Sequence, residues 1–169
     1  MAGWAVELIF GSIPIWTLQW SGCGDVSGSG SGYGYGSGSG AGSGSGDGDG
    51  DGYWLTVFKA SVLRWSEEPR KRLQECWNKA SAIAFWRSDK NGFPSNGGES
   101  NEAAAPGVIH KTSGPLSLCH SGTLHATMKP EEWKGERLWV VALFGEIKCE
   151  EGKFGALERE IVGEIDLHG

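Results

Sequence analysis

The sequence has few cysteines, no dense run of basic residues and no long apolar stretch, and each absence excludes a class of protein. Its four cysteines, Cys23, Cys76, Cys119 and Cys149, are widely separated, and no pair has CxxC spacing. A small secreted disulfide scaffold has more closely spaced cysteines. We therefore expect reduced thiols in a cytoplasm.

Basic residues are not gathered into a nucleic-acid footprint. The densest group, Arg70 to Arg72, is typical of a solvated helix face. All 15 Lys and Arg residues follow position 52, together with 16 of the 21 acidic residues. The C-terminal part is therefore close to neutral, and we expect no nucleic-acid partner.

The apolar start of the chain is neither a signal peptide nor a membrane span. It lacks a basic beginning, and Glu7, Gly11 and Pro14 interrupt it. Residues 1–21 are expected to form either a hairpin of two strands or a plain extension.

Glycine occupies every even position from Gly28 to Gly52, with Ser, Tyr and Asp between. This pattern is typical of a flexible linker, because Gly and Ser bury too little surface to offset backbone entropy. A period of two also fits closely stacked, silk-like strands. We assign 22–52 to this tract and 53–169 to one globular domain.

The domain is predicted to be α+β, with a mixed, mostly antiparallel sheet. Tyr53–Ala60 reads as its first strand. Ser66–Ala80 has an N-cap, an acidic first turn and apolar residues at helical spacing, and is the main helix. A short helix is expected at Pro130–Lys134, after the proline.

The other predicted strands follow apolar runs or alternation. They are Ile83–Trp86, Leu116–Cys119, Thr123–Thr127 and the unbroken apolar run Trp139–Phe144. Leu157–Ile165 fits a strand or a helix, and Ile161-Val162 favours the strand. The loop between the first and second of these strands, 94–107, is long for a compact domain.

The predicted core consists of large apolar residues from these elements. It comprises Leu55, Val57, Leu73, Trp77, Ile83, Phe85, Leu116, Leu118, Leu124, Trp133, Trp139, Val141, Leu143, Ile147, Leu157, Ile161 and Ile165.

Several segments between Ile83 and Ile165 resemble a domain of unknown function found in bacteriophage and bacterial proteins. They are IAFWRSDKNG, PGVIHKTSGPLSLCHSGTLHAT, ERLWVVALFGEI and KFGALEREIVGEI. The chain departs from that pattern at Thr123-Leu124, where one more residue separates Gly122 from His125. The resemblance implies a fold unit and a phage or prophage setting in a bacterial host cell, without a reaction.

The first functional hypothesis is an accessory or binding domain without catalysis. The chain has no glycine-rich phosphate loop with lysine, no HExxH and no GxSxG. Its partner would be a protein or a small ligand.

The second hypothesis is an ADP-ribosyltransferase-like enzyme that binds NAD. GTLHAT is similar to that superfamily's central Gly-Ile-Tyr-Phe-Ala step. The predicted helix and strand after it are similar to the helix and strand that follow that step. The similarity implies that His125 stacks the nicotinamide and Arg87 holds the pyrophosphate. A late glutamate, Glu164 or else Glu158 or Glu160, would bind a ribose hydroxyl.

The third hypothesis is a small metal site. Cys119, His120, His125 and Cys149 are residue types that bind zinc. Strand alternation would place Cys119 and His120 on opposite faces, so both reach one ion only with a bulge. A Cys119–His125 nucleophile pair is the related catalytic alternative, and it lacks an orienting motif.

Overall fold

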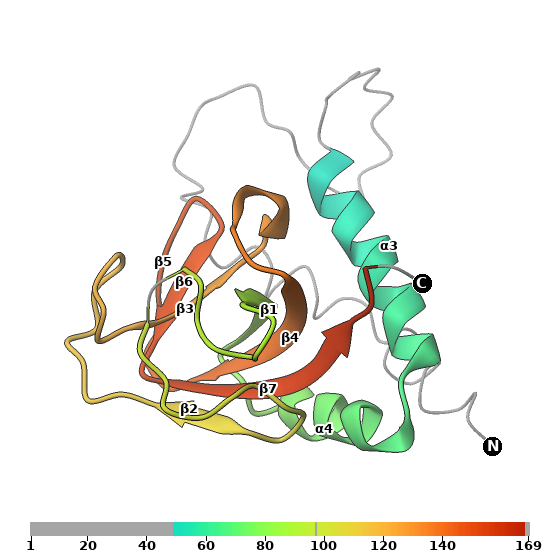
Figure 1. Ribbon diagram of the computed structural model, residues 1–169, viewed down its shortest axis with the longest axis horizontal. Helices are drawn as coiled ribbons and strands as arrows, with labels where there is room; N and C mark the ends of the chain where they lie inside the picture. Colours follow the sequence, from blue (N-terminus) through green and yellow to red (C-terminus); the bar gives the residue numbers. More distant parts are fainter. Residues whose placement is uncertain (1–48, 97, 168–169) are drawn as a thin grey trace.

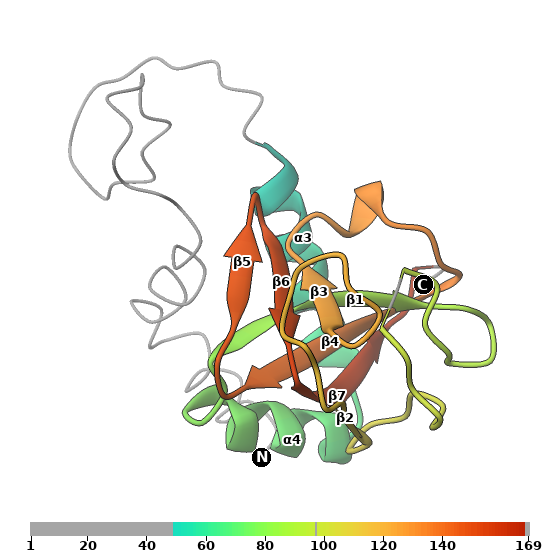
Figure 2. The ribbon, with the colours of Figure 1, turned by 90° about the vertical axis from the view of Figure 1, so that its left-hand side faces the viewer.

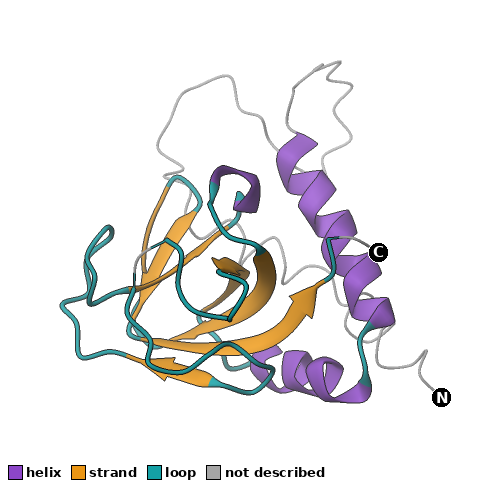
Figure 3. Ribbon diagram, viewed as in Figure 1, coloured by secondary structure: helices purple, strands orange, loops and turns teal. Residues whose placement is uncertain are grey.

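The computed structural model describes residues 49–96 and 98–167. The predicted segment 1–21 and the glycine tract up to residue 48 lie outside the described residues. The chain from Asp49 onward folds as two helices and a seven-stranded sheet, which confirms the α+β class (Figure 3).

Helix α3 spans Asp49–Arg64, so the strand predicted at Tyr53–Ala60 is wrong. The apolar side chains that the helix and the turn after it bury are Trp54, Phe58, Val62 and Trp65. They are three or four positions apart, which is the spacing of one helix face. The eight residues of the predicted strand were too short a window to separate this period from alternation.

Helix α4 spans Glu67–Trp77 and lies within the predicted helix. Ser66 occupies the N-cap position, but its hydroxyl makes no capping hydrogen bond. Leu73, Cys76 and Trp77 are buried, as the helical spacing predicted. The predicted short helix at Pro130–Lys134 is a single 3-10 turn, η1, at Pro130–Glu132.

The sheet contains β1 to β7 in the order β2-β7-β4-β1-β3-β6-β5, and every described pairing is antiparallel. Four strands match predicted ones and three are short strands that were not predicted. The matching strands are β1 (Ala82–Ser88), β3 (Leu124–Thr127), β4 (Arg137–Phe144) and β7 (Glu158–Ile165). The others are β2 (Ile109–Lys111), β5 (Lys148–Glu150) and β6 (Lys153–Ala156).

The sheet is strongly curved, and both helices lie on its outer side beside β7 (Figures 1 and 2). On the outer face the Phe85 ring contacts Trp54 and Phe58, at centroid distances of 5.9 and 6.5 Å. Trp65 covers Gly163 so closely that a Cβ there would lie 2.7 Å from the indole. Glycine at this position therefore lets α3 approach the sheet.

Strand β4 runs through the middle of the core, paired with β1 on one side and β7 on the other. Its six inner residues are all buried, as the unbroken apolar run predicted. A β-bulge interrupts its pairing with β7 between Val140 and Val141.

The strand predicted at Leu116–Cys119 is wrong, because this segment is a loop. Gly114 and Cys119 both have positive φ, +89° and +66°, which breaks an extended strand. The alternation of Leu116 and Leu118 instead places both side chains near Gly155 of β6.

Most of the predicted core is buried in the structure, and several of its members are only half-buried. The half-buried ones are Val57, Ile83, Leu116, Leu118, Trp133, Ile147 and Leu157. The side chain of Leu55 lies outside the described residues. Large buried side chains that were not predicted are Phe58, Trp86, Phe154 and Arg159.

The expectation of four reduced thiols is wrong for Cys149, which is disulfide-bonded, whereas Cys76 and Cys119 are free. Cysteine spacing in the sequence does not report distance in space, so the spacing argument failed there. In the described part of the chain, neither helix has the length and apolar character needed to cross a membrane.

Candidate functional site

Arg87, the predicted pyrophosphate ligand, is half-buried on β1 and holds two backbone carbonyls. Its Nε donates to the Pro130 oxygen at 2.7 Å and its Nη1 to the Gly135 oxygen at 3.0 Å. Burial lowers the pKa of Arg87. The guanidinium thus fastens η1 and the turn after it to the sheet.

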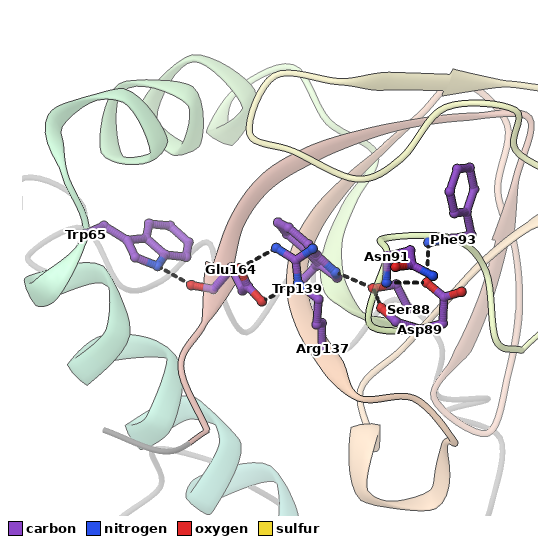
Figure 4. A network of polar contacts seen from close by, with 8 residues as sticks. All are labelled: Trp65, Ser88, Asp89, Asn91, Phe93, Arg137, Trp139 and Glu164. Atoms are coloured by element: carbon purple, nitrogen blue, oxygen red, sulfur yellow. Dashed lines mark hydrogen bonds and ion pairs between the residues drawn. The ribbon is translucent and has the colours of Figure 1, made fainter.

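Glu164, the predicted ribose ligand, forms a bidentate ion pair with Arg137, with both N–O distances at 2.7 Å (Figure 4). Its backbone oxygen accepts a hydrogen bond from Trp65 Nε1. Glu164 pairs with Trp139, whereas Arg87 pairs with Leu138, the neighbouring residue of β4. The side chains of Arg87 and Glu164 therefore point to opposite faces of the sheet.

Around Glu164 the polar contacts continue along the ends of β4 and β1 (Figure 4). The Arg137 guanidinium lies 4.4 Å above the Trp139 ring, and Trp139 Nε1 donates to Ser88 Oγ. Asp89 then accepts from the backbone of Asn91 and Phe93. These bonds fix a turn and two strand ends, and they engage both oxygens of Glu164.

His125 is buried on β3, where its Nε2 accepts a hydrogen bond from the Cys119 backbone N–H at 3.2 Å. The Cys119 thiol lies on the surface, 3.0 Å from Lys153 Nζ. His120 Nδ1 accepts from the Gly122 N–H. In the described residues, no group of three His, Cys, Asp or Glu is placed to hold a metal ion.

A buried arginine that the sequence analysis did not single out lies at the centre of the inner face. Arg159 on β7 is fully buried, and its guanidinium carbon lies 3.9 Å from the Trp86 ring. Its Nη1 donates to the His125 backbone oxygen at 2.7 Å and its Nη2 contacts His110 Nδ1 at 2.9 Å. Burial lowers the pKa of Arg159 to about 9.

His110 links Arg159 to a surface loop. A guanidinium only donates, so His110 Nδ1 must accept and its proton lies on Nε2. That Nε2 donates to the backbone oxygen of Glu102 at 3.0 Å. Burial and the charge of Arg159 lower the pKa of His110 to about 4. The neutral ring therefore ties the segment 99–102 to the interior.

A groove of about 550 Å³ runs along β2, outside the His110 ring. One wall is β2 and the residues after it, up to Gly114, and the opposite walls are the segments 99–102 and 120–122. Two hydrogen bonds close one end, from Thr112 Oγ1 to the Gly122 oxygen and from the Glu99 N–H to the Ser121 oxygen.

The backbone of β2 presents hydrogen-bonding groups on its outer edge. Val108 and Thr112 bond to β7 through the Val108 oxygen and the Thr112 N–H. Alternate residues of an antiparallel strand bond to the same neighbour, so the N–H and C=O groups of Ile109 and Lys111 face away from β7. No described residue pairs with these outward groups.

The side chains along this edge are partly apolar and partly charged. Ile109 is 45% exposed. Lys111 forms an ion pair with Glu158 at 2.9 Å. Glu99 and Glu102 are exposed on the opposite wall, and neither is in an ion pair among the described residues.

Comparison with known proteins gives no family for this chain. No family model, no curated protein and no solved structure matches it.

Sequence reasoning missed this site, because β2 has only three residues and follows a long loop. The available signal was the alternation of Val108, His110 and Thr112 with Ile109 and Lys111 just after Gly107. Three to five alternating residues are too few to identify a strand by period alone.

Proposed function

We propose that this domain is a non-catalytic binding module that captures an extended segment of a partner protein as an additional strand beside β2. The observation that carries the proposal is the outer edge of β2, whose unpaired backbone groups face an open groove. Main-chain hydrogen bonds to such an edge supply affinity, and neighbouring side chains supply specificity.

The size of the groove supports an extended segment rather than another folded domain. The three residues of β2 span roughly 10 Å in extended conformation, so a captured segment of the same length pairs with the whole strand. The segments 99–102 and 120–122 bound the groove on the side opposite β2. A second copy of the sheet would bring its own neighbouring strands against these walls.

The resemblance of Ile83–Ile165 to a domain of phage and bacterial proteins supports a phage or prophage setting for the partner. In that setting the module is an accessory component that recruits another protein. A standard protein–protein interface buries about 1,600 Å² in total, and a contact along one short strand buries less. Interfaces of such small area are weak and transient. We therefore expect dissociation constants of roughly 10 to 100 μM for single peptides.

Substitution Lys111→Pro should weaken this binding, because proline removes an outward N–H while it is tolerated on a strand edge. The probe is a displayed library of random 12-residue peptides, selected on the full-length chain. We expect selected peptides to bind the Lys111→Pro variant at least about tenfold more weakly, since one or two hydrogen bonds of about 1 kcal/mol are lost. Fluorescence anisotropy measures the dissociation constants.

The matched control is Lys111→Ala, which removes the same side chain and keeps the N–H. It should bind the selected peptides within about threefold of the wild type, since the exposed ion pair with Glu158 contributes little. Peptides that bind both variants equally well would show that the edge of β2 is not the binding site. A selection that enriches no peptide would also overturn the proposal.

A further inference from the structure

We infer that the captured segment carries a lysine or arginine opposite His110, flanked by an apolar residue opposite Ile109. This inference rests on the proposed function and adds the chemistry of the partner. It follows from the charges on the two walls of the groove and from strand alternation.

The alternation of an added strand decides which of its residues meets which wall. A residue placed opposite His110 points its side chain to the same side of the sheet as the His110 ring. That side is where the Glu102 backbone oxygen accepts from His110 Nε2, at 3.0 Å. The side chain opposite His110 is therefore the one that meets the segment 99–102.

The wall formed by that segment is acidic. Glu99 and Glu102 both line the groove and are exposed, and no described cation neutralises them. Lys111, on the β2 side, is already paired with Glu158. The groove thus presents two carboxylates to an incoming side chain.

Besides Lys111, which Glu158 pairs, the positive charge of Arg159 opposes this attraction. Its guanidinium lies behind the His110 ring, bonded to Nδ1, and has no exposed surface. The ring separates it from the groove, whereas the two carboxylates line the groove itself. The acidic wall therefore decides the preference.

The residues on either side of the basic one point to the other side of the sheet. The residue of the added strand that pairs with Ile109 lies beside the Ile109 side chain, which is 45% exposed. Apolar and β-branched pairs across strands are favourable, so this position selects an apolar residue. The recognised segment therefore carries an apolar residue next to its basic one.

The test uses peptides selected on the full-length chain, resynthesised with Lys, Arg, Ala, Asp or Glu at each position in turn. At the position opposite His110, we expect peptides with Lys or Arg to bind about five- to tenfold more tightly than peptides with Asp or Glu. This is the effect of two exposed charge pairs. The preference should weaken as salt rises from about 0.05 to 0.5 M, because the charges are solvent-exposed.

The double variant Glu99→Gln, Glu102→Gln should reduce this charge preference to about twofold or less while it still binds alanine-containing peptides. Glu146→Gln is the matched control, since Glu146 is exposed in the turn before β5 and does not line the groove. It should keep the full preference.

The outcomes separate this inference from the proposed function. Peptides that lose affinity on Lys111→Pro but show no charge preference would overturn the inference and leave strand addition intact. A preference for Asp or Glu, or a preference for Lys that survives in the double variant, would also overturn it. If Lys111→Pro binds the peptides as tightly as the wild type, the proposed function itself is overturned.

Discussion

Substitution Arg159→Ala should lower the free energy of unfolding by about 3 kcal/mol. The side chain is fully buried and holds the His125 oxygen and His110 Nδ1. Its loss leaves two buried acceptors without donors, at about 1 to 3 kcal/mol each, and opens a cavity that costs a further 2 to 5 kcal/mol.

Removing the buried charge of Arg159 acts in the opposite direction and stabilises the alanine variant. The buried guanidinium is paired with no carboxylate among the described residues, and burial lowers its pKa from 12.5 to about 9. A shift of that size corresponds to roughly 5 kcal/mol of unfavourable desolvation that the alanine variant no longer carries. The losses of roughly 8 kcal/mol exceed this relief, so the variant is destabilised.

Arg159→Met separates the contributions, because methionine fills most of the volume, stacks on Trp86 and carries no charge. We expect it to be more stable than the alanine variant by about 2 kcal/mol or more. Urea unfolding monitored by tryptophan fluorescence gives both values. An alanine variant as stable as the wild type would show that this guanidinium does not hold the inner face together.

The stability of the domain should also fall as the pH drops from 6.5 towards 4, and His110 should account for roughly 2 to 3 kcal/mol of that loss. Burial and the nearby Arg159 lower the pKa of His110 from 6.5 to about 4 in the folded state. The unfolded chain binds a proton below pH 6.5 and the folded chain does not. The stabilisation is thus complete above pH 6.5 and is lost as the pH falls through this window.

His110→Gln is the variant that tests this assignment, since its amide can accept from Arg159 and donate towards the Glu102 oxygen without titrating. Its unfolding free energy should change less between pH 7 and 4 than that of the wild type, by the same 2 to 3 kcal/mol. Identical pH profiles for wild type and His110→Gln would contradict the buried, neutral state of this ring.

The parts of the fold that could be predicted are those in which one period extends over enough residues. The run Trp139–Phe144 has no polar break and therefore forms a strand that is covered on both faces. Helix α4 combines an acidic first turn with a clear apolar face. Leu157–Ile165 fitted two periods, and its β-branched pair correctly favoured the strand.

The errors occurred where a short segment carried two signals. Tyr53–Ala60 is apolar enough for a strand, but its buried residues continue to Trp65 at helical spacing. Leu116 and Leu118 alternate, yet positive φ at Gly114 and Cys119 bends the segment into a loop. Both outcomes depend on contacts with distant parts of the chain, which local periodicity does not contain.

The candidate site was the least predictable part. Hydrophobicity gives no reason to bury an arginine, so the sequence did not single out Arg159. Its burial depends on Trp86 and on acceptors from β2 and β3, which are far apart in the sequence. Arg87, His125 and Glu164, the residues selected for an NAD site, lie on three different strands, and each takes part in hydrogen bonds within the domain.

Amide hydrogen exchange at Ile109 and Lys111, in the full-length chain with and without a selected peptide, tests strand addition most directly. Binding should slow the exchange of these two outward amides by at least about tenfold, while His110 and Thr112, whose amides face β7, change little. Unchanged exchange at Ile109 and Lys111 in the presence of saturating peptide would contradict the account.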